Sequence, residues 1–102
     1  RHARALSGRA TTATQHALLA AYYAATGNAR AAIRFARRGI AIDPTCWRCF
    51  SALADADVAL GNLPGALIAQ ATAVNLLAED DPRRPRHRRR LAELEQKLFV
   101  LR

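Results

Sequence analysis

Cys46 and Cys49 are the residues of this chain whose type and spacing are best suited to chemistry, and they lie in the sequence CWRC. Two thiols at this spacing near a helix start can form a redox pair, because a helix N-terminus favours thiolate. The motif follows no strand, and Phe50 comes after it, so thioredoxin-like and haem-attachment contexts are both missing. Zinc needs four ligands, but there is no second cysteine pair and the histidines are scattered. We expect packing thiols, with a disulfide or a redox pair as alternatives, and no metal or other cofactor.

Arginines form the second chemically suggestive group. The net charge is +8, from fifteen arginines and one lysine against eight acidic residues. A possible patch for an anionic partner consists of Arg83, Arg84, Arg86, Arg88, Arg89 and Arg90. Arginines 30, 34, 37 and 38 are candidates to extend it towards a phosphate-binding surface. No aromatic residue lies among these arginines for bases to stack on, which disfavours nucleic acid. Two other interpretations of these arginines remain. One is a solvated surface, and the other is docking on an acidic protein or on the chain's own acidic residues 79–81.

Catalysis has little support in the sequence. There is no glycine-rich phosphate loop, and no nucleophile has a base at a recognisable spacing. We therefore expect a non-catalytic protein.

The elements that must position these residues are helices. Alanine is abundant and no strand-like alternation occurs, which predicts an all-α fold. Glycine-asparagine pairs at 27–28 and 61–62 and the Asp43-Pro44 pair mark the breaks. The predicted helices span residues 13–26, 29–42, 47–60, 63–77 and 86–100. A polar, increasingly basic connector covers residues 79–90, and the last helix has an apolar stripe of Leu91, Leu94, Leu98 and Leu101.

A thirty-four-residue period runs through the middle of the chain. It relates Leu19-Ala20, Ala25, Gly27-Asn28 and Ala32 to Leu53-Ala54, Ala59, Gly61-Asn62 and Ala66. A fixed period of this length predicts stacked structural repeats. Such stacks usually present a surface to another chain rather than a pocket for catalysis.

Residues 13–46 and 47–80 each form one predicted helix pair, with alanines and a glycine at the same repeated positions. These two pairs resemble tetratricopeptide repeats (TPRs). The resemblance implies a right-handed α-solenoid of antiparallel helix pairs. Residues 81–102 would then be a basic connector and C-terminal capping helix, and residues 1–12 the remnant of a preceding repeat or an N-terminal extension. The chain departs from the family pattern at His16, Asp57 and Ala78. Because a buried lone carboxylate is costly, we expect Asp57 to be exposed or paired with an arginine.

In this family the first helix of each pair lines a concave groove. The resemblance therefore implies a partner-binding surface made of Thr14, Ala17, Leu18, Ala21, Arg48, Ser51 and Asp55. The alternative is that neighbouring helices cover these positions. Some family members bind acidic C-terminal tails with a clamp of polar side chains, and the alanines at 17 and 21 leave no such clamp here.

The function implied by the resemblance is that of a scaffold or adaptor. It would bind a helix or extended segment of another protein, as part of a multi-subunit assembly. Two alternatives remain: a basic nucleic-acid-binding module, and an accessory repeat domain of a larger enzyme. Steep salt dependence of DNA or RNA affinity would favour the first, and a catalytic domain on the full-length chain would favour the second.

The sequence says little about location. No stretch approaches eighteen apolar residues, so no membrane span is predicted, and no signal peptide is visible. Because the chain starts at Arg1 rather than Met, we expect a piece of something longer. The cytoplasm is slightly favoured over a periplasmic or membrane-associated location. The excess of alanine and arginine fits a GC-rich bacterial genome.

Overall fold

The computed structural model describes residues 2–100, and the side chains of residues 8–100. Those residues form five helices and no strand, which confirms the all-α prediction. The helices are α1 (His2–Ala25), α2 (Ala29–Ile42), α3 (Trp47–Ala59), α4 (Leu63–Leu76) and α5 (Arg84–Val100).

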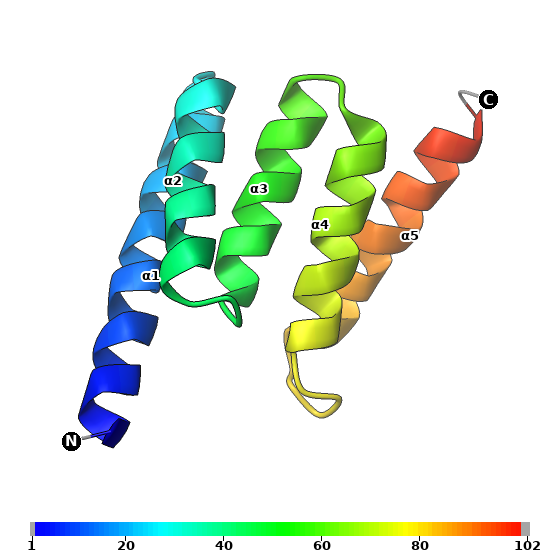
Figure 1. Cartoon of the computed structure of the whole chain (residues 1–102). Helices are drawn as coiled ribbons and strands as arrows, with labels where there is room; N and C mark the ends of the chain where they lie inside the picture. The colour runs from blue at the N-terminus through cyan, green and yellow to red at the C-terminus, as the bar shows by residue number, and fades with distance from the viewer. Residues whose placement is uncertain (1, 101–102) are drawn as a thin grey trace.

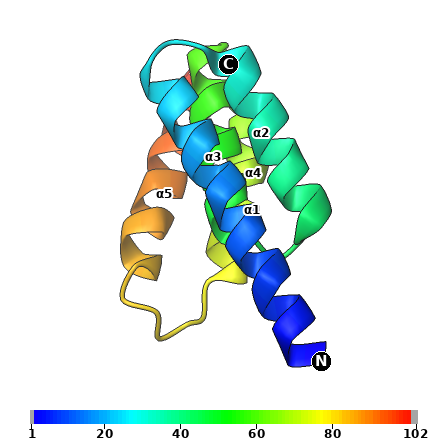
Figure 2. The ribbon, with the colours of Figure 1, turned by 90° about the vertical axis from the view of Figure 1, so that its left-hand side faces the viewer.

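The helices lie side by side in chain order (Figure 1). Each packs on the next one along the chain, and α3 also packs on α1. As a result α3 has three helical neighbours, whereas the backbone of α5 packs on α4 alone. Figure 2 views the row from its α1–α2 end and shows the N-terminal turns of α1 projecting beyond the other helices.

The two glycine bends have the same geometry. Gly27 and Gly61 have φ angles of 88° and 78°, in the left-handed region that suits glycine. At the first bend, the backbone N–H of Asn28 donates to the carbonyl oxygen of Tyr23 at 2.8 Å. The Asn28 side chain then accepts a hydrogen bond from the backbone N–H three residues on, at 3.2 Å. Asn62 makes the same two bonds at the second bend, at 2.8 and 3.1 Å.

Alanines make up most of the core. Ala20, Ala36 and Ala52, from the first three helices, meet in one buried cluster. Because a methyl group occupies little space, helices that meet through alanine approach closely. The approach is closer still at Gly39, because a Cβ there would collide with the sulfur of Cys49.

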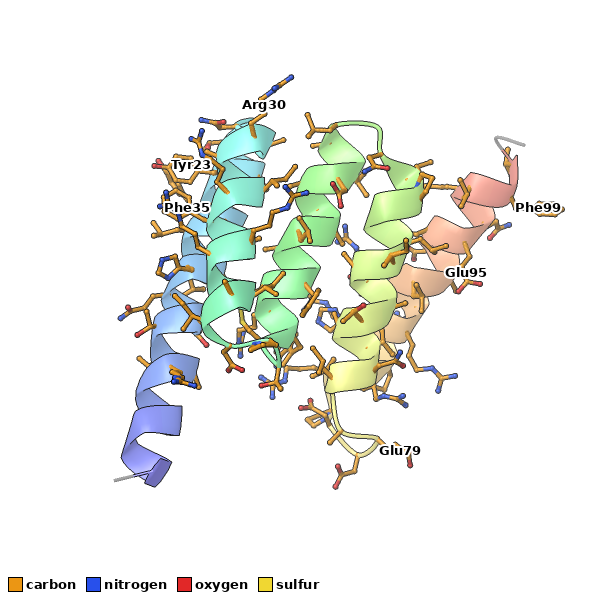
Figure 3. All side chains as sticks on the ribbon, viewed as in Figure 1. Tyr23, Arg30, Phe35, Glu79, Glu95 and Phe99 are labelled. Atoms are coloured by element: carbon orange, nitrogen blue, oxygen red, sulfur yellow. A yellow bond between two sulfur atoms is a disulfide. The ribbon has the colours of Figure 1, made fainter. Side chains whose placement is uncertain are left out.

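Large apolar side chains are exposed towards both ends of the row. On α1, Leu19 and Tyr22 are 43% and 62% exposed, and on α5 Phe99 is 73% exposed. Figure 3 shows Phe99 projecting from the α5 end, and Tyr23 beside Phe35 at the other. The Tyr23 and Phe35 rings are stacked with their centres 5.4 Å apart.

Two helices begin earlier than the sequence predicts. The structure continues the first helix back to His2, instead of ending a separate helix before residue 13. No proline interrupts this segment. Residues 8–12 are exposed, so from residue 8 onwards Ala13 is the first buried residue. The last helix begins at Arg84 rather than at residue 86, because Pro85 is tolerated in a first turn.

Leucines of the predicted stripe attach α5 to α4. Leu94 is only 3% exposed, and Leu91 and Leu98 are partly buried. Leu101 lies outside the described residues. The stripe therefore faces the chain's own α4 over these three positions.

Asp57 is buried, with 8% of its surface exposed, so the first of the two expected alternatives, an exposed side chain, is wrong. For the second alternative, Arg37 acts on the carboxyl through its charge, but Asp57 forms no ion pair among the described residues. Burial raises the pKa of the Asp57 carboxyl. The positive charge of Arg37 and a hydrogen bond with the Asn62 side chain act in the opposite direction. The side chain thus has polar support, although burial is the largest influence on it.

Candidate functional site

A groove of about 260 Å³ gathers six of the seven residues predicted to face a partner. They are Ala17, Leu18 and Ala21 from α1, with Arg48, Ser51 and Asp55 from α3. Thr14 lies instead in a neighbouring pocket that shares Trp47 and Arg48 with the groove. The structure therefore brings six of the seven predicted residues into one groove and places Thr14 beside it.

The opposite wall of the groove comes from residues that the repeat pattern did not place there. Arg83, Arg86 and His87 line it, at the turn before α5 and in the first turns of that helix. The chain returns towards α3 after α4, and this fold-back is set by tertiary packing. In the sequence, Arg83 and Arg86 stand out as members of the basic run, the arginines between positions 83 and 90. That run does not indicate which surface of the folded chain its members join.

Trp47 organises the positively charged part of the groove. The guanidinium carbon of Arg48 lies 4.5 Å from the centre of its ring, and that of Arg83 lies 5.0 Å away. The His87 ring meets the Trp47 ring edge to face, with the centres 5.1 Å apart. Cation–π contacts of this kind hold arginines in place. They also occupy the indole surface that a stacking ligand would need.

Two carboxylates, Asp55 in the groove wall and Asp81 just outside the lining, are already paired. Asp81 accepts hydrogen bonds from Nε and a terminal nitrogen of Arg83, both at 3.0 Å. Asp55 forms an ion pair with Arg90. Burial raises the pKa of the Asp55 carboxyl, and the charge of Arg90 and its hydrogen bond oppose that rise. Asp55 therefore stands in the groove wall as half of an ion pair.

Arg48 and Arg86 differ from those arginines. Neither has a carboxylate within ion-pair distance among residues 8–100. Arg48 belongs to α3 and Arg86 to α5, so the two guanidinium groups come from two different walls of the groove. Among the arginines that line the groove, Arg48 and Arg86 are therefore the two whose positive charge is free to bind an anionic group.

His87 anchors the start of α5. The fully buried Gln70 donates from Nε2 to the carbonyl oxygen of His87 at 3.0 Å and lies 3.2 Å from its Nδ1. These two contacts join the middle of α4 to the first turn of α5. Burial lowers the pKa of His87, as do the charges of the nearby Arg86, Arg90 and Arg83, while Asp55 raises it.

The two cysteines form a disulfide, which corrects the first expectation of separate packing thiols. Their Cα atoms are 5.3 Å apart, as one helical turn requires and as a disulfide allows. Both are also buried, so the packing part of the expectation holds. Cys46 caps α3 by accepting a hydrogen bond from the Cys49 N–H at 3.2 Å. The disulfide thus fixes the turn that presents Trp47 and Arg48.

The basic run divides among several surroundings rather than forming one uniform patch. Arg83 and Arg86 line the groove, and Arg84 donates from Nε to the Val74 carbonyl oxygen at 3.3 Å. Arg89 and Arg90 join Arg86 at a small hollow on α5, and Arg88 is exposed. The arginines of α2 do not extend this surface, because α2 does not pack on α5.

A larger hollow of about 450 Å³ lies between α4 and the end of α5, with Leu63, Lys97 and Val100 in its lining. Glu93 and Gln96 also line it, although most of the surface that it exposes is apolar. The groove between α1, α3 and α5 is the better candidate site, because it gathers residues of three helices and includes two guanidinium groups without a carboxylate partner among the described residues.

Across the described residues, no three His, Cys, Asp or Glu side chains come together as metal ligands. None of the described helices has the length and apolar character needed to cross a bilayer. Comparisons with protein-family models, curated proteins and solved structures find no significant match to this chain. The groove is thus the feature from which a function can be inferred.

Proposed function

We propose that this chain is a non-catalytic protein-binding unit of the tetratricopeptide-repeat type, and that its groove holds a segment of a partner protein. In this proposal the helix pairs follow a right-handed α-solenoid. The chain acts as a scaffold or adaptor within a larger assembly.

The observation that carries the proposal is the convergence of six predicted residues on one groove. The floor includes Ala17, Ala21 and Ala52, whose small side chains let a partner's backbone or helix come close. Helices that are already packed lose little freedom on binding, which limits the entropic cost of association. The equivalent bends at Gly27 and Gly61 support the repeat assignment.

The test is to block the groove and follow the partners. Ala21 and Ala41 are both exposed alanines in helices, but only Ala21 lines the groove. Tryptophan at position 21 would fill the space that a partner needs, whereas Ala41→Trp adds the same bulk on α2. Each tagged full-length variant would be purified from its native host at native level, and its companions quantified by mass spectrometry.

We expect Ala21→Trp to lose companions that the wild type and Ala41→Trp both retain. Equal retention by the two variants would contradict the groove as the binding site. Circular dichroism of both variants is the control for folding, because a misfolded chain would also lose its partners.

A further inference from the structure

We propose that the groove selects an acidic peptide segment, in which carboxylate side chains flank an apolar one. Arg48 and Arg86 would bind the carboxylates. This inference rests on the proposed protein-binding function and names the chemical class of the partner.

The floor of the groove supplies the apolar half of the recognition. Leu18 is 61% exposed there, next to the methyl groups of Ala17, Ala21 and Ala52. An apolar side chain of a partner would cover Leu18 and remove this surface from water. The volume of about 260 Å³ suits a few side chains of a peptide.

The charges around the floor supply the other half. Asp55 is the one carboxylate among the residues lining the groove, and it is already paired with Arg90. Arg83 is held by Asp81. Arg48 and Arg86 are left with positive charge and no carboxylate partner among the described residues. A partner with acidic side chains on both sides of its apolar residue would supply the two missing carboxylates.

The structure also prepares one of these arginines for binding. The guanidinium of Arg48 rests 4.5 Å from the centre of the Trp47 ring, beside the disulfide that fixes this turn. Holding a long side chain in place before binding reduces the entropy lost when it is used. A guanidinium offers a carboxylate two parallel hydrogen bonds, which are stronger than neutral ones.

A single-stranded nucleic acid fits the same groove less well. Such ligands bind through phosphate contacts together with bases stacked on aromatic rings. Trp47 is the aromatic residue other than histidine in the groove lining, and Arg48, Arg83 and His87 already lie against its ring. The acidic peptide uses the arginines without needing the covered ring.

The experiment begins with selection of short random peptides displayed on phage against the immobilised chain. The enriched sequences are then synthesised and their affinities measured by fluorescence anisotropy. Each is compared with a version in which Asn and Gln replace Asp and Glu. The protein variants are Arg48→Gln, Arg86→Gln and the matched control Arg34→Gln, an exposed arginine on α2. A fluorescein-labelled oligouridine tests nucleic acid in parallel.

We expect enrichment of acidic residues around an apolar one, and loss of binding by the Asn and Gln versions. Arg48→Gln and Arg86→Gln should each weaken the acidic peptide about tenfold or more, the cost of one charge-assisted hydrogen-bonded pair. Arg34→Gln should leave the affinity unchanged. Equal weakening by all three variants would overturn the inference, because it would indicate a general charge effect.

The remaining outcomes separate this inference from the proposed function. Enrichment of neutral or basic peptides that Ala21→Trp excludes would overturn the acidic specificity and leave the groove as a protein-binding site. Failure to enrich any peptide, or binding insensitive to Ala21→Trp, would count against the proposed function itself. Oligouridine binding that depends on Arg48 and Arg86, without any acidic peptide, would replace the peptide with a nucleic acid.

Discussion

Asp57 carries a charge at a core position of the thirty-four-residue period. Its counterpart one period earlier is Tyr23, which stacks on Phe35. At position 57 the carboxylate has no such packing and is only 8% exposed. Burial raises its pKa, and Arg37 and Asn62 offset part of the effect. Burial therefore makes the charged form of this carboxyl less favourable than it is in water.

Replacing Asp57 by Asn should stabilise the protein at neutral pH. Because the folded pKa lies above the unfolded one, the folded state binds more protons between the two values. Stability is then lost as pH rises through that window, and at pH 7 the full penalty is present. Asn keeps the shape without the charge. We expect urea unfolding to show a gain of about 1 kcal/mol at pH 7, the typical scale of one buried polar interaction.

The same comparison at pH 3 provides the check on its cause. There the wild-type carboxyl is protonated in both states, so the advantage of Asp57→Asn should disappear. Asp80→Asn, in the exposed turn before α5, is the control and should have little effect at either pH. A loss of stability in Asp57→Asn at pH 7 would show that the ionised carboxylate makes a favourable interaction.

Residue types at repeated positions predict burial where the side chain is small. Ala20 and Ala54, one period apart, are both fully buried, as close helix packing requires. The contact between Gln70 and His87 could not be predicted in this way. It joins α4 to α5 across a connector, and no period relates the two residues.

The disulfide was compatible with the CWRC spacing, but spacing alone does not distinguish a bond from two packed thiols.

The bends are the elements that fix the repeat geometry. Gly27 and Gly61 both have positive φ, and no heavy atom beyond the glycine and its two chain neighbours lies within 4 Å of where a Cβ would be. Crowding therefore plays no part at these sites, and backbone conformation is the reason for glycine. Gly8 gives the matched case, since its surroundings are equally open but its backbone is helical.

Alanine substitutions at the three glycines should consequently change the free energy of unfolding in different directions. Gly27→Ala and Gly61→Ala should each destabilise the protein by about 1–2 kcal/mol, because alanine is strained in the left-handed region. Gly8→Ala should have the opposite effect or none, since alanine favours a helix by about 0.5–1 kcal/mol over glycine. Thermal unfolding of the three variants measures this. Destabilisation of Gly8→Ala by a similar amount would contradict the explanation.

Helix boundaries were predictable where a bend or cap residue marks them. Asn28 and Asn62 cap α2 and α4 as asparagine commonly does, and the glycines before them end the preceding helices. The start of α1 had no such marker. Its alanine- and threonine-containing N-terminal turns continue the helix, so a repeat boundary in the sequence does not become a break in the backbone.

At the scale of the whole molecule, contacts run between neighbours along the row. α3 packs on α1, α2 and α4, whereas the backbone of α5 has only α4 beside it. Side chains alone connect α5 to α3, through His87 on Trp47 and Arg90 on Asp55. The apolar hollow between α4 and the end of α5 also leaves the last turns less closely packed. Stability should therefore decrease from α3 towards the end of α5.

Amide hydrogen exchange should reveal this gradient. Elements with few packed neighbours open locally at lower free energy than the core. We expect α3 to exchange most slowly and the end of α5 faster than its first turns, which Gln70 and His87 hold.

Leu94→Ala tests the origin of that gradient, because Leu94 is only 3% exposed against α4. Removing a buried leucine side chain costs about 2–5 kcal/mol, and a chain of neighbour contacts confines most of this loss to the affected end. Exchange in α5 should accelerate while α1 and α2 change little, and Leu18→Ala, at an exposed leucine, should leave α5 unaffected. If Leu94→Ala instead accelerated all five helices equally, the molecule would unfold as a single cooperative unit. The end helix would then be as firmly held as the centre.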